Sequence, residues 1–473
     1  MLKKLFSNSF IYAVGPQIPK LASIFLLPLY TQKLTNIDYG IFALITVYTG
    51  LLSGLRDLGM TQPLVNVFFK NKIYWKKIWG NIWGLLTFFS IPYLLLFTII
   101  LYFSCYNQVG NNFWIIVLLQ VISTLLFDLP AKFGSLYFQL SAKPLPIAIL
   151  SAVNGILIIA VQYVLVVWYN MHYMAFVYAF FLAGVIPFFY FGYVTFFKLH
   201  IFPSFKLKVR LLKGYLKVGL PLIPHNYSSY LLNISDRLVM DVLHVPQNKI
   251  GNYSFAYNFG SYADMVGTSI GMAVSPFSQK GYAINKEEVV KNLFEMLQLF
   301  FIVGSCFICI WMKEIFQILV RNDELRATYD MAIIIVMGYV YRPLYWGVIS
   351  FLGFKERTSS LWKISFIASI INVALNFLLI PIWGYKVATL NTFISLLYLA
   401  IAGFYLQSYK QVAKVNYNHL RWLGCILLAS VVTYFCKDLF VLYKIFFSMA
   451  LVLIAFFYVY NKRELFSEFK DLM

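Results

Sequence analysis

The chain has 473 residues, of which 61% are hydrophobic and only 12% are charged, and its formal net charge is +20. A water-soluble protein of this size could not cover so much apolar surface, so the composition excludes a soluble globular fold. The net positive charge alone does not imply nucleic acid as a partner, because the basic residues are distributed by side of a membrane, as described below.

The apolar residues come in stretches of about 20, which is the length of an α-helix that crosses a bilayer. We therefore predict an all-α polytopic membrane protein with about fourteen transmembrane helices. The first stretch follows Lys3-Lys4 but is not a signal peptide, because it is too long, is broken by Pro16 and Pro19, and lacks a small-residue cleavage site. In chain order the predicted spans are 9–32, 40–64, 78–103, 113–137, 146–168, 173–197, 215–240, 252–276, 291–312, 328–349, 361–381, 386–407, 419–436 and 440–460.

The loops between these spans differ in charge. With a cytoplasmic N-terminus, most Lys and Arg fall in loops on the cytoplasmic side, so the positive-inside rule places both termini in the cytoplasm. The longest polar stretch, 198–214, is basic, and we expect it to lie along the inner membrane surface against anionic lipid headgroups. The segment Lys70–Trp79 mixes cations and aromatics and is expected at the same interface.

The order of glycines and prolines indicates an internal duplication, in which residues from about 14 to 175 recur weakly from about 218 to 388. The matched positions, at nearly constant separation, are Gly40 with Gly251, Gly59-Met60 with Gly271-Met272, Pro130 with Pro343, Gly134 with Gly347, and Ala175 with Ala388. Each copy holds six spans, and an even number gives two lobes of the same orientation, which often enclose a transporter's substrate site.

The predicted domains follow from this repeat. They are an N-terminal lobe (1–197), a basic cytoplasmic inter-lobe linker (198–214), a C-terminal lobe (215–407), and two extra C-terminal helices with a cytoplasmic tail (408–473).

Ionisable side chains at lipid depth are costly and are functional candidates by default. Lys20 and His225 each follow an Ile-Pro pair at matching places in the two repeats. Proline frees backbone carbonyls and bends a helix, as is typical where a helix lines a cavity. We predict that both side chains face a cavity and bind substrate.

Two further pairs of adjacent charges are Arg56-Asp57 and Asp236-Arg237. Adjacent residues on a helix point about 100° apart, so each side chain is expected to find a partner on another helix. For Arg56 and Arg237 both interhelical pairing and substrate contact stay open, while Asp57 and Asp236 lean towards a structural role.

The remaining intramembrane charges are Asp128, Lys132, Arg342 and Asp264. Asp128 and Lys132 are four residues apart and are expected to form an ordinary pair along one helix. Lys132 and Arg342 are candidates for substrate binding at the mouth of a cleft. Asp264 stands alone in its span, and it joins Asp128 and Asp236 as a candidate for coupling to a proton or sodium gradient.

Several chemistries leave no trace in the sequence. There is no GxxxxGK[ST] phosphate-binding loop, no HExxH metal motif and no covalent catalytic constellation. The CxxC of Cys306 and Cys309 lies in a lipid-depth span without a second pair, which favours packing over a metal. We expect a transporter rather than an enzyme, with no cofactor and no metal.

A resemblance to a known family rests on short motifs that occur in a fixed order over nearly the whole chain. These are Pro28-Leu29-Tyr30-Thr31, Asp38-Tyr39-Gly40-Ile41-Phe42, Leu58-Gly59-Met60, Gly219-Leu220-Pro221-Leu222-Ile223-Pro224, Ser235-Asp236-Arg237, Ile250-Gly251-Asn252-Tyr253-Ser254, Asn372-Val373-Ala374-Leu375-Asn376, Ile380-Pro381 with Gly384, and Ala388-Thr389. In these the chain resembles the polysaccharide-unit (O-antigen, Wzx-type) flippases of the multidrug/oligosaccharidyl-lipid/polysaccharide exporter superfamily.

The resemblance implies two six-helix lobes plus two helices, set in the bacterial inner membrane and working by alternating access. The implied substrate is an undecaprenyl-pyrophosphate-linked oligosaccharide, turned to the outer leaflet for O-antigen (lipopolysaccharide), capsule or exopolysaccharide synthesis, with a polysaccharide polymerase and assembly proteins as partners. A pyrophosphate suits a cationic cleft, and we predict that Lys20 and Arg56 contact it. A lipid II flippase and a cation-coupled multidrug exporter of the same superfamily are the alternatives.

Overall fold

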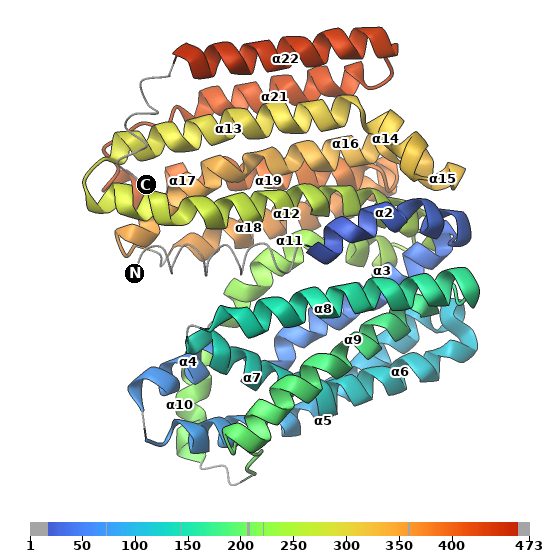
Figure 1. Cartoon of the computed structure of the whole chain (residues 1–473), viewed down its shortest axis with the longest axis vertical. Coiled ribbons are helices and arrows are strands. Elements are labelled where there is room, and N and C mark those ends of the chain that lie inside the picture. The colour runs from blue at the N-terminus through green and yellow to red at the C-terminus, as the bar shows by residue number, and fades with distance from the viewer. Residues whose placement is uncertain are drawn as a thin grey trace. The chain divides into compact units, whose positions relative to one another are not determined.

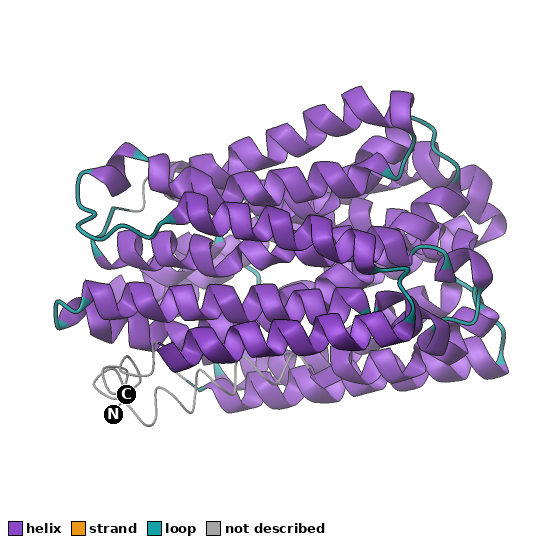
Figure 2. Cartoon of the chain, turned by 90° about the horizontal axis from the view of Figure 1, so that it is seen from above, coloured by secondary structure: helices purple, strands orange, loops and turns teal. Residues whose placement is uncertain are grey.

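The computed structural model describes residues 18–461 except 72, 142, 206–208, 221 and 358–359. Helices joined by short loops account for this part of the chain, and no strand occurs among its residues (Figure 2). The predicted all-α class is therefore confirmed. The residues before Ile18, including the start of the first predicted span, lie outside the described residues.

The chain divides into two compact units, each described here by itself. The N-terminal unit holds the described residues up to Asp241 together with Pro246–Gly251, and the C-terminal unit holds Val242–Val245 and the described residues from Asn252 on. In this division the seventh predicted span falls in the N-terminal unit, whereas our predicted lobe boundary precedes it. The lobe boundaries stay a prediction.

The N-terminal unit is built from ten helices among its described residues (Figure 1). They are α2 (Ile18–Lys33), α3 (Asn36–Arg56), α4 (Thr61–Lys70), α5 (Trp75–Val109), α6 (Phe113–Ile122), α7 (Asp128–Leu140), α8 (Pro144–Tyr163), α9 (Met174–Tyr193), α10 (Val209–Gly219) and α11 (Leu222–Val242). Short irregular turns, η2 (Gly110–Asn112), η3 (Ser123–Phe127), η4 (Val164–Trp168) and η5 (Val194–Lys198), extend or join them.

The C-terminal unit holds the remaining helices (Figure 1). They are α12 (Gln247–Ala283, whose first turn groups with the other unit), α13 (Glu287–Ile310), α14 (Met312–Leu319), α15 (Asp323–Arg326), α16 (Tyr329–Gly338), η6 (Tyr339–Tyr341), α17 (Arg342–Phe354), α18 (Leu361–Trp383), α19 (Val387–Tyr405), α20 (Gln407–Lys410), α21 (His419–Cys436) and α22 (Val441–Asn461). The last two helices, which have no counterpart in the repeat, pack on α13.

Each of the fourteen predicted spans overlaps one of these helices or a pair of them joined by a short turn. Within the described part, nine helical stretches are long and apolar enough to cross a membrane, one of them running continuously from Trp75 to Leu140. That stretch is long enough to cross twice, and α2, α3, α11 and α12 are more polar. The count of fourteen is compatible with this result.

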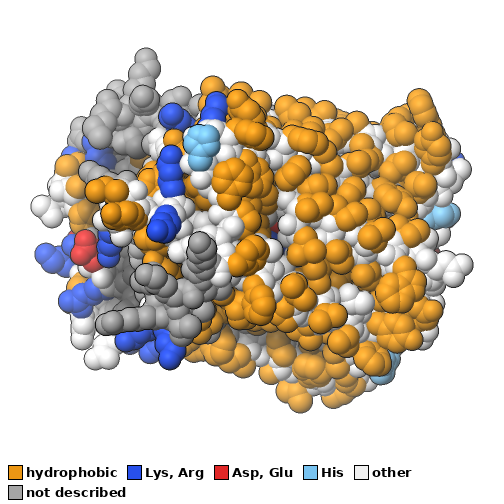
Figure 3. Space-filling view, turned by 90° about the horizontal axis from the view of Figure 1, so that it is seen from below, with side chains coloured by type: hydrophobic (Ala, Val, Ile, Leu, Met, Phe, Trp, Pro, Cys, Tyr) orange, Lys and Arg blue, Asp and Glu red, His pale blue; other side chains and the backbone are white. Residues whose placement is uncertain are grey.

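The surface has the chemistry of a multi-pass membrane protein. Only 11% of the most apolar part of α22 is buried inside the protein. The corresponding figure is 72% for the stretch Asp323–Phe354 of the C-terminal unit. Figure 3 shows a face covered mostly by hydrophobic side chains, with Lys and Arg gathered at one end. Such an apolar surface is stable only against lipid.

Three local breaks in the helices position the charged residues. Between α3 and α4 the backbone adopts positive φ at Leu58 (47°) and Gly59 (66°), which ends α3 directly after Arg56. Two residues separate the irregular turn η3 from Pro130, and one residue separates η6 from Pro343. Because proline lacks an N–H and clashes with the preceding turn, both helices loosen there.

Aromatic packing fixes α7 beside α5 and α4. The ring of Trp83 stacks on Phe133 at 5.0 Å between centroids, and Trp79 packs edge-on against the same ring at 5.6 Å. The buried indole of Trp79 also donates a hydrogen bond to the Leu64 carbonyl at 3.1 Å. The start of α7 is thereby held close to the end of α3.

Candidate functional site

The end of α3 and the start of α7 are joined by two ion pairs. Nη1 of Arg56 lies 2.8 Å from Oδ2 of Asp128, and Nζ of Lys132 lies 2.7 Å from Oδ2 of Asp57. We call these four residues the α3–α7 ion pairs. They bring three of the predicted site residues, Arg56, Asp128 and Lys132, together in the N-terminal unit.

The geometry corrects one expectation and confirms another. Asp128 and Lys132 do not pair with each other along α7, because both side chains project from one face of α7 towards α3 and take opposite charges there. The predicted pair along one helix is therefore wrong. The expectation that Arg56 and Asp57 find partners on another helix is confirmed.

Burial within the α3–α7 ion pairs is uneven. The Arg56 side chain is 6% exposed and its guanidinium lies 5.8 Å from the ring centre of Tyr93. Asp128 is 44% exposed and Asp57 38%. The cation is thus fixed inside the unit by packing, while the carboxylates that neutralise this site reach solvent-accessible space. Because these carboxylates are already partly exposed, they can leave their ion pairs at a lower free-energy cost than the buried cation can.

In the C-terminal unit an ion pair joins α12 and α17, between Asp264 and Nη2 of Arg342. Asp264, which stands alone in its predicted span, therefore has a partner on another helix. Arg342 is 17% exposed, and its guanidinium lies near the rings of Tyr339 and Tyr341, at 5.8 and 5.7 Å from their centres. Gly267 makes the room, since a Cβ there would come within 2.8 Å of the Arg342 Cδ.

Beside this ion pair the C-terminal unit contains a cavity of about 450 Å³. We call it the C-terminal cavity. Side chains from α12 and α17 supply most of its wall, among them Thr268, Ser275, Gln279, Arg342, Trp346 and Ser350. Sequence reasoning missed all of these except Arg342. The signal was present in the polar or small residues Thr268, Gly271, Ser275 and Gln279, which share one face of α12.

The other predicted site residues lie on α2 and α11. Lys20 is in the first turn of α2 and His225 in the first turn of α11, but their side chains are outside the described residues. Asp236 and Arg237 are both buried in α11, and Nη1 of Arg237 donates a hydrogen bond to the Asn233 carbonyl at 2.9 Å. The roles of these four residues stay predictions.

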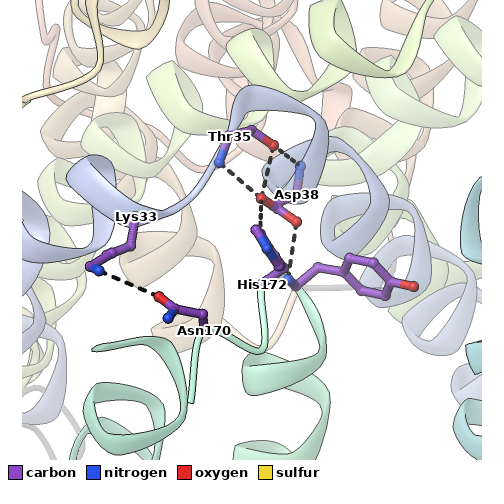
Figure 4. A network of polar contacts seen from close by, with 6 residues as sticks. Lys33, Thr35, Asp38, Asn170 and His172 are labelled. Atoms are coloured by element: carbon purple, nitrogen blue, oxygen red, sulfur yellow. Dashed lines mark hydrogen bonds and ion pairs between the residues drawn. The ribbon is translucent and has the colours of Figure 1, made fainter. Parts of the chain in front are cut away.

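A polar network at the start of α3 ties elements of the N-terminal unit together (Figure 4). Thr35 and Asp38 form a reciprocal capping box, and the same Asp38 carboxylate accepts a hydrogen bond from the Tyr173 backbone N–H at 3.1 Å. His172 lies 3.3 Å from Asp38, and Lys33 reaches Asn170 at 3.4 Å. The 5% exposed Asp38 thus ties α3 to the loop before α9.

A second buried network crosses α18 and α19. The amide of Asn376 donates to Asn372 at 2.8 Å, that of Asn391 donates to Asn376 at 2.9 Å, and that of Asn372 reaches Thr392 at 3.3 Å. All four side chains are at most 1% exposed. Hydrogen-bonded amides of this kind join helices at lipid depth, where unpaired polar groups are costly.

No group of three His, Cys, Asp or Glu residues close enough to bind a metal occurs in the part of the chain that the structure describes. The five cysteines are free, and Cys306 and Cys309 are buried in α13. The packing role of that CxxC stays a prediction.

Together the apolar helices and the charged groups within them define a polytopic membrane protein. The chain belongs to the polysaccharide biosynthesis protein family, whose model matches residues 5–281. The MatE family model matches residues 221–378, and both matches place the chain in the exporter superfamily expected from its motifs. No match was found among curated proteins.

Solved structures share the fold. A lipid II flippase MurJ in an inward closed conformation is 14% identical with a TM-score of 0.72, covering 96% of this chain and 99% of the other. A Vibrio cholerae MATE transporter, VcmN, is 11% identical with a TM-score of 0.56, covering 90% and 99%. A MOP superfamily transporter from Pyrococcus furiosus is 9% identical with a TM-score of 0.55, covering 94% and 96%. At these identities the likeness shows the fold alone.

Proposed function

We propose that the protein flips undecaprenyl-pyrophosphate-linked oligosaccharide units from the cytoplasmic to the outer leaflet of the bacterial inner membrane. It would do so by alternating access and would serve O-antigen, capsule or exopolysaccharide synthesis. The observation that carries the proposal is the polysaccharide biosynthesis family match over residues 5–281. The fold shared with a lipid II flippase supports it, because that substrate is also a lipid-linked saccharide.

The α3–α7 ion pairs suit the anionic head of such a substrate. A diphosphate needs at least two cationic groups close together, and Arg is favoured because its guanidinium can bind two phosphate oxygens. Arg56 and Lys132 supply two cations from neighbouring helices. In the resting protein Asp128 and Asp57 occupy the places that phosphate oxygens would take.

Substrate binding is then an exchange of anions. The diphosphate displaces the carboxylate of Asp128 from Arg56, and the half-exposed carboxylate turns towards water. This keeps Arg56 neutralised at every stage, so the transporter never holds an uncompensated buried cation. Lys20, His225 and Arg237 are proposed to receive the head at other stages of the cycle, and Arg342 is proposed to bind another part of the substrate from the wall of the C-terminal cavity.

Coupling to a proton or sodium gradient is assigned to Asp264, Asp128 and Asp236. Protonation of Asp128 would release Arg56 in the same way as the diphosphate does, because a neutral carboxyl no longer balances the guanidinium. The lipid tail stays in the bilayer while the saccharide crosses inside the protein.

The test is complementation in a bacterium that lacks its own polysaccharide-unit flippase but carries the cognate glycan genes. Surface glycan is scored for the wild type, Lys20→Ala and Arg56→Ala at matched membrane levels. The exposed Arg357, whose side chain bonds only to Gln411 among the described residues, supplies the control Arg357→Ala. We expect surface glycan with the wild type and the control. With Lys20→Ala and Arg56→Ala we expect the amount of surface glycan to fall by about tenfold or more.

The alternatives give different outcomes. Rescue of a strain depleted of its lipid II flippase, without surface glycan in the first strain, would assign lipid II as the substrate. Efflux of cationic drugs without either rescue would make the chain a multidrug exporter.

A further inference from the structure

The C-terminal cavity plays no part in the anion exchange at Arg56, and its lining sets several polar side chains among apolar ones. On α12, Thr268, Gly271, Ser275 and Gln279 line it at intervals of three or four residues, so they form one continuous stripe. The neighbouring helix α17 contributes Trp346 and Ser350. At about 450 Å³ it falls within the usual size of small-ligand sites.

The polar groups of this wall are left mainly with hydrogen-bond acceptors for a ligand. The Thr268 hydroxyl donates its proton to the Asp264 carbonyl at 2.8 Å, and the Ser350 hydroxyl donates to the Trp346 carbonyl at 2.7 Å. The Gln279 amide donates to the Ser350 carbonyl at 3.3 Å. Each group already donates a hydrogen bond to a backbone carbonyl, so it offers a ligand mainly the lone pairs of its oxygen.

A flat apolar surface stands beside these acceptors. The Trp346 ring packs edge-on against Phe301 at 5.6 Å between centroids, which fixes its orientation. Gly271 lies directly under the indole, since a Cβ there would come within 2.8 Å of its ring atoms. The glycine that the repeat pairs with Gly59 therefore makes room for an aromatic platform.

We propose that the C-terminal cavity is a saccharide-binding subsite, which takes one or two sugar rings of the lipid-linked unit; this inference rests on the proposed function. A sugar offers many hydroxyl donors, which the acceptors of Thr268, Gln279 and Ser350 require. Its C–H face is apolar and fits against the Trp346 ring.

Charge argues against an ionic occupant. Arg342, the one cation among the described residues of the wall, is balanced by Asp264, so these residues present no net charge for an isolated phosphate or an organic cation to neutralise. The cavity therefore offers hydrogen-bond acceptors and a stacking surface together.

The test measures binding of two lipids to the purified full-length protein in nanodiscs. One probe is undecaprenyl diphosphate carrying the cognate repeat unit, and the other is undecaprenyl diphosphate without sugar. The variants are Trp346→Ala, Trp346→Phe and Gln279→Leu. The matched control is Trp383→Ala, which removes a 66% exposed indole from α18 of the same unit.

We expect Trp346→Ala and Gln279→Leu, which remove a stacking contact and a hydrogen-bonding group, each to weaken binding of the glycan-bearing lipid by about fivefold, equivalent to about 1 kcal/mol. Trp346→Phe keeps a ring and should weaken it by less. Binding of the sugar-free lipid stays within about twofold of the wild type in every variant. Gln279→Leu and Trp346→Phe carry the test if Trp346→Ala does not accumulate.

Three results would overturn the assignment. Equal losses for both lipids would make the role of these side chains structural, and no loss for either would leave the glycan elsewhere. Binding of tetraphenylphosphonium that is abolished by Trp346→Ala, without an effect on the glycan-bearing lipid, would make the cavity a cation site. If the wild type binds neither lipid, the proposed function itself fails, and this inference with it.

Discussion

The α3–α7 crossing of the N-terminal unit and the α12–α17 crossing of the C-terminal unit involve helices that the repeat relates. Each crossing carries an ion pair next to a matched proline, Pro130 or Pro343. In the N-terminal unit the cation Arg56 comes from the first helix of the crossing and the carboxylate Asp128 from the second. In the C-terminal unit the order is reversed, with Asp264 on the first and Arg342 on the second.

The difference teaches that the predicted repeat has kept a charge pair at this helix crossing, but neither the matched residue positions nor the polarity of the pair. Pairing two helices by charge works in either sense, because the Coulomb attraction is symmetric, whereas binding an anion works only where the cation is the fixed partner. In both units the arginine is the more buried member, at 6% against 44% exposed in the N-terminal pair and 17% against 34% in the C-terminal pair. The N-terminal crossing also carries a second cation, Lys132, on α7. It therefore suits the diphosphate, whereas the single balanced pair of the C-terminal crossing suits the cavity beside it.

The largest expected effect comes from leaving Asp264 without its partner. Arg342→Met should lower the free energy of unfolding by about 2–3 kcal/mol, somewhat below the value for a fully buried pair because Asp264 is 34% exposed. The double variant Arg342→Met/Asp264→Leu should recover most of the loss. Thermal unfolding in detergent measures both, and equal stability of the single variant and the wild type would contradict the pairing.

Reversing the polarity of the N-terminal crossing separates stability from transport. Arg56→Met should cost about 2 kcal/mol, and the exchange Arg56→Asp/Asp128→Arg should restore much of that loss by remaking the pair. Surface glycan should stay absent in the exchanged protein, because the buried partner is then an anion. Glycan at the wild-type level would show that the polarity of the crossing does not matter.

The two matched glycines should respond differently. Gly59 has φ of +66° and its Cβ position overlaps the Gly219 carbonyl, so Gly59→Ala should destabilise the N-terminal unit by about 1–2 kcal/mol. Gly271→Ala meets a side chain rather than backbone. It should shift the Trp346 ring and weaken binding of the glycan-bearing lipid, with a smaller effect on unfolding. If one of the two variants, Gly59→Ala or Gly271→Ala, had the larger effect on both unfolding and lipid binding, the expected contrast between the two positions would be wrong.

The smallest effect is expected at an ion pair outside the spans, in the turn between α21 and α22. The hydrogen bond from Lys313 to Asp438, 2.9 Å long, lowers the pKa of that carboxyl below its ordinary value of 3.8. A lowered pKa stabilises the fold above the ordinary value, and this contribution is lost as the pH falls through the lowered one. Asp438→Asn should cost less than about 1 kcal/mol near neutral pH, because Asp438 is 48% exposed, and the difference from the wild type should vanish in acid. Unfolding measured against pH tests this, and a difference that persists at low pH would contradict it.

Hydropathy predicted the helical spans well, because twenty consecutive apolar residues have few stable arrangements other than a membrane helix. It could not predict the break after Arg56, where the same Gly-Met pair ends α3 but lies within the continuous α12. That choice depends on the tight approach of Gly219 to Gly59, which local sequence does not encode.

The site was predicted in its residue types and only partly in its contacts. The free-energy cost of a charge at lipid depth singled out Arg56, Asp128, Lys132, Asp264 and Arg342. Their partners depend on which helices cross, so the predicted pair along α7 was wrong. The C-terminal cavity was missed because hydroxyl and indole groups are common in apolar helices. Only the spacing along α12 and the packing of α17 distinguish them.

The final helix carries one more consequence. Lys444 of α22 is fully buried, and its ammonium donates to both carboxylate oxygens of Glu314 at 2.6 and 2.8 Å. A lone lysine costs an apolar segment several kcal/mol on entry into the bilayer. The counter-charge on α14 is synthesised 130 residues earlier, so it can be in the bilayer before Lys444 arrives. We therefore expect Glu314→Gln to leave α22 incompletely inserted, as protease protection would reveal. In that case the ion pair makes membrane insertion of α22 depend on α14.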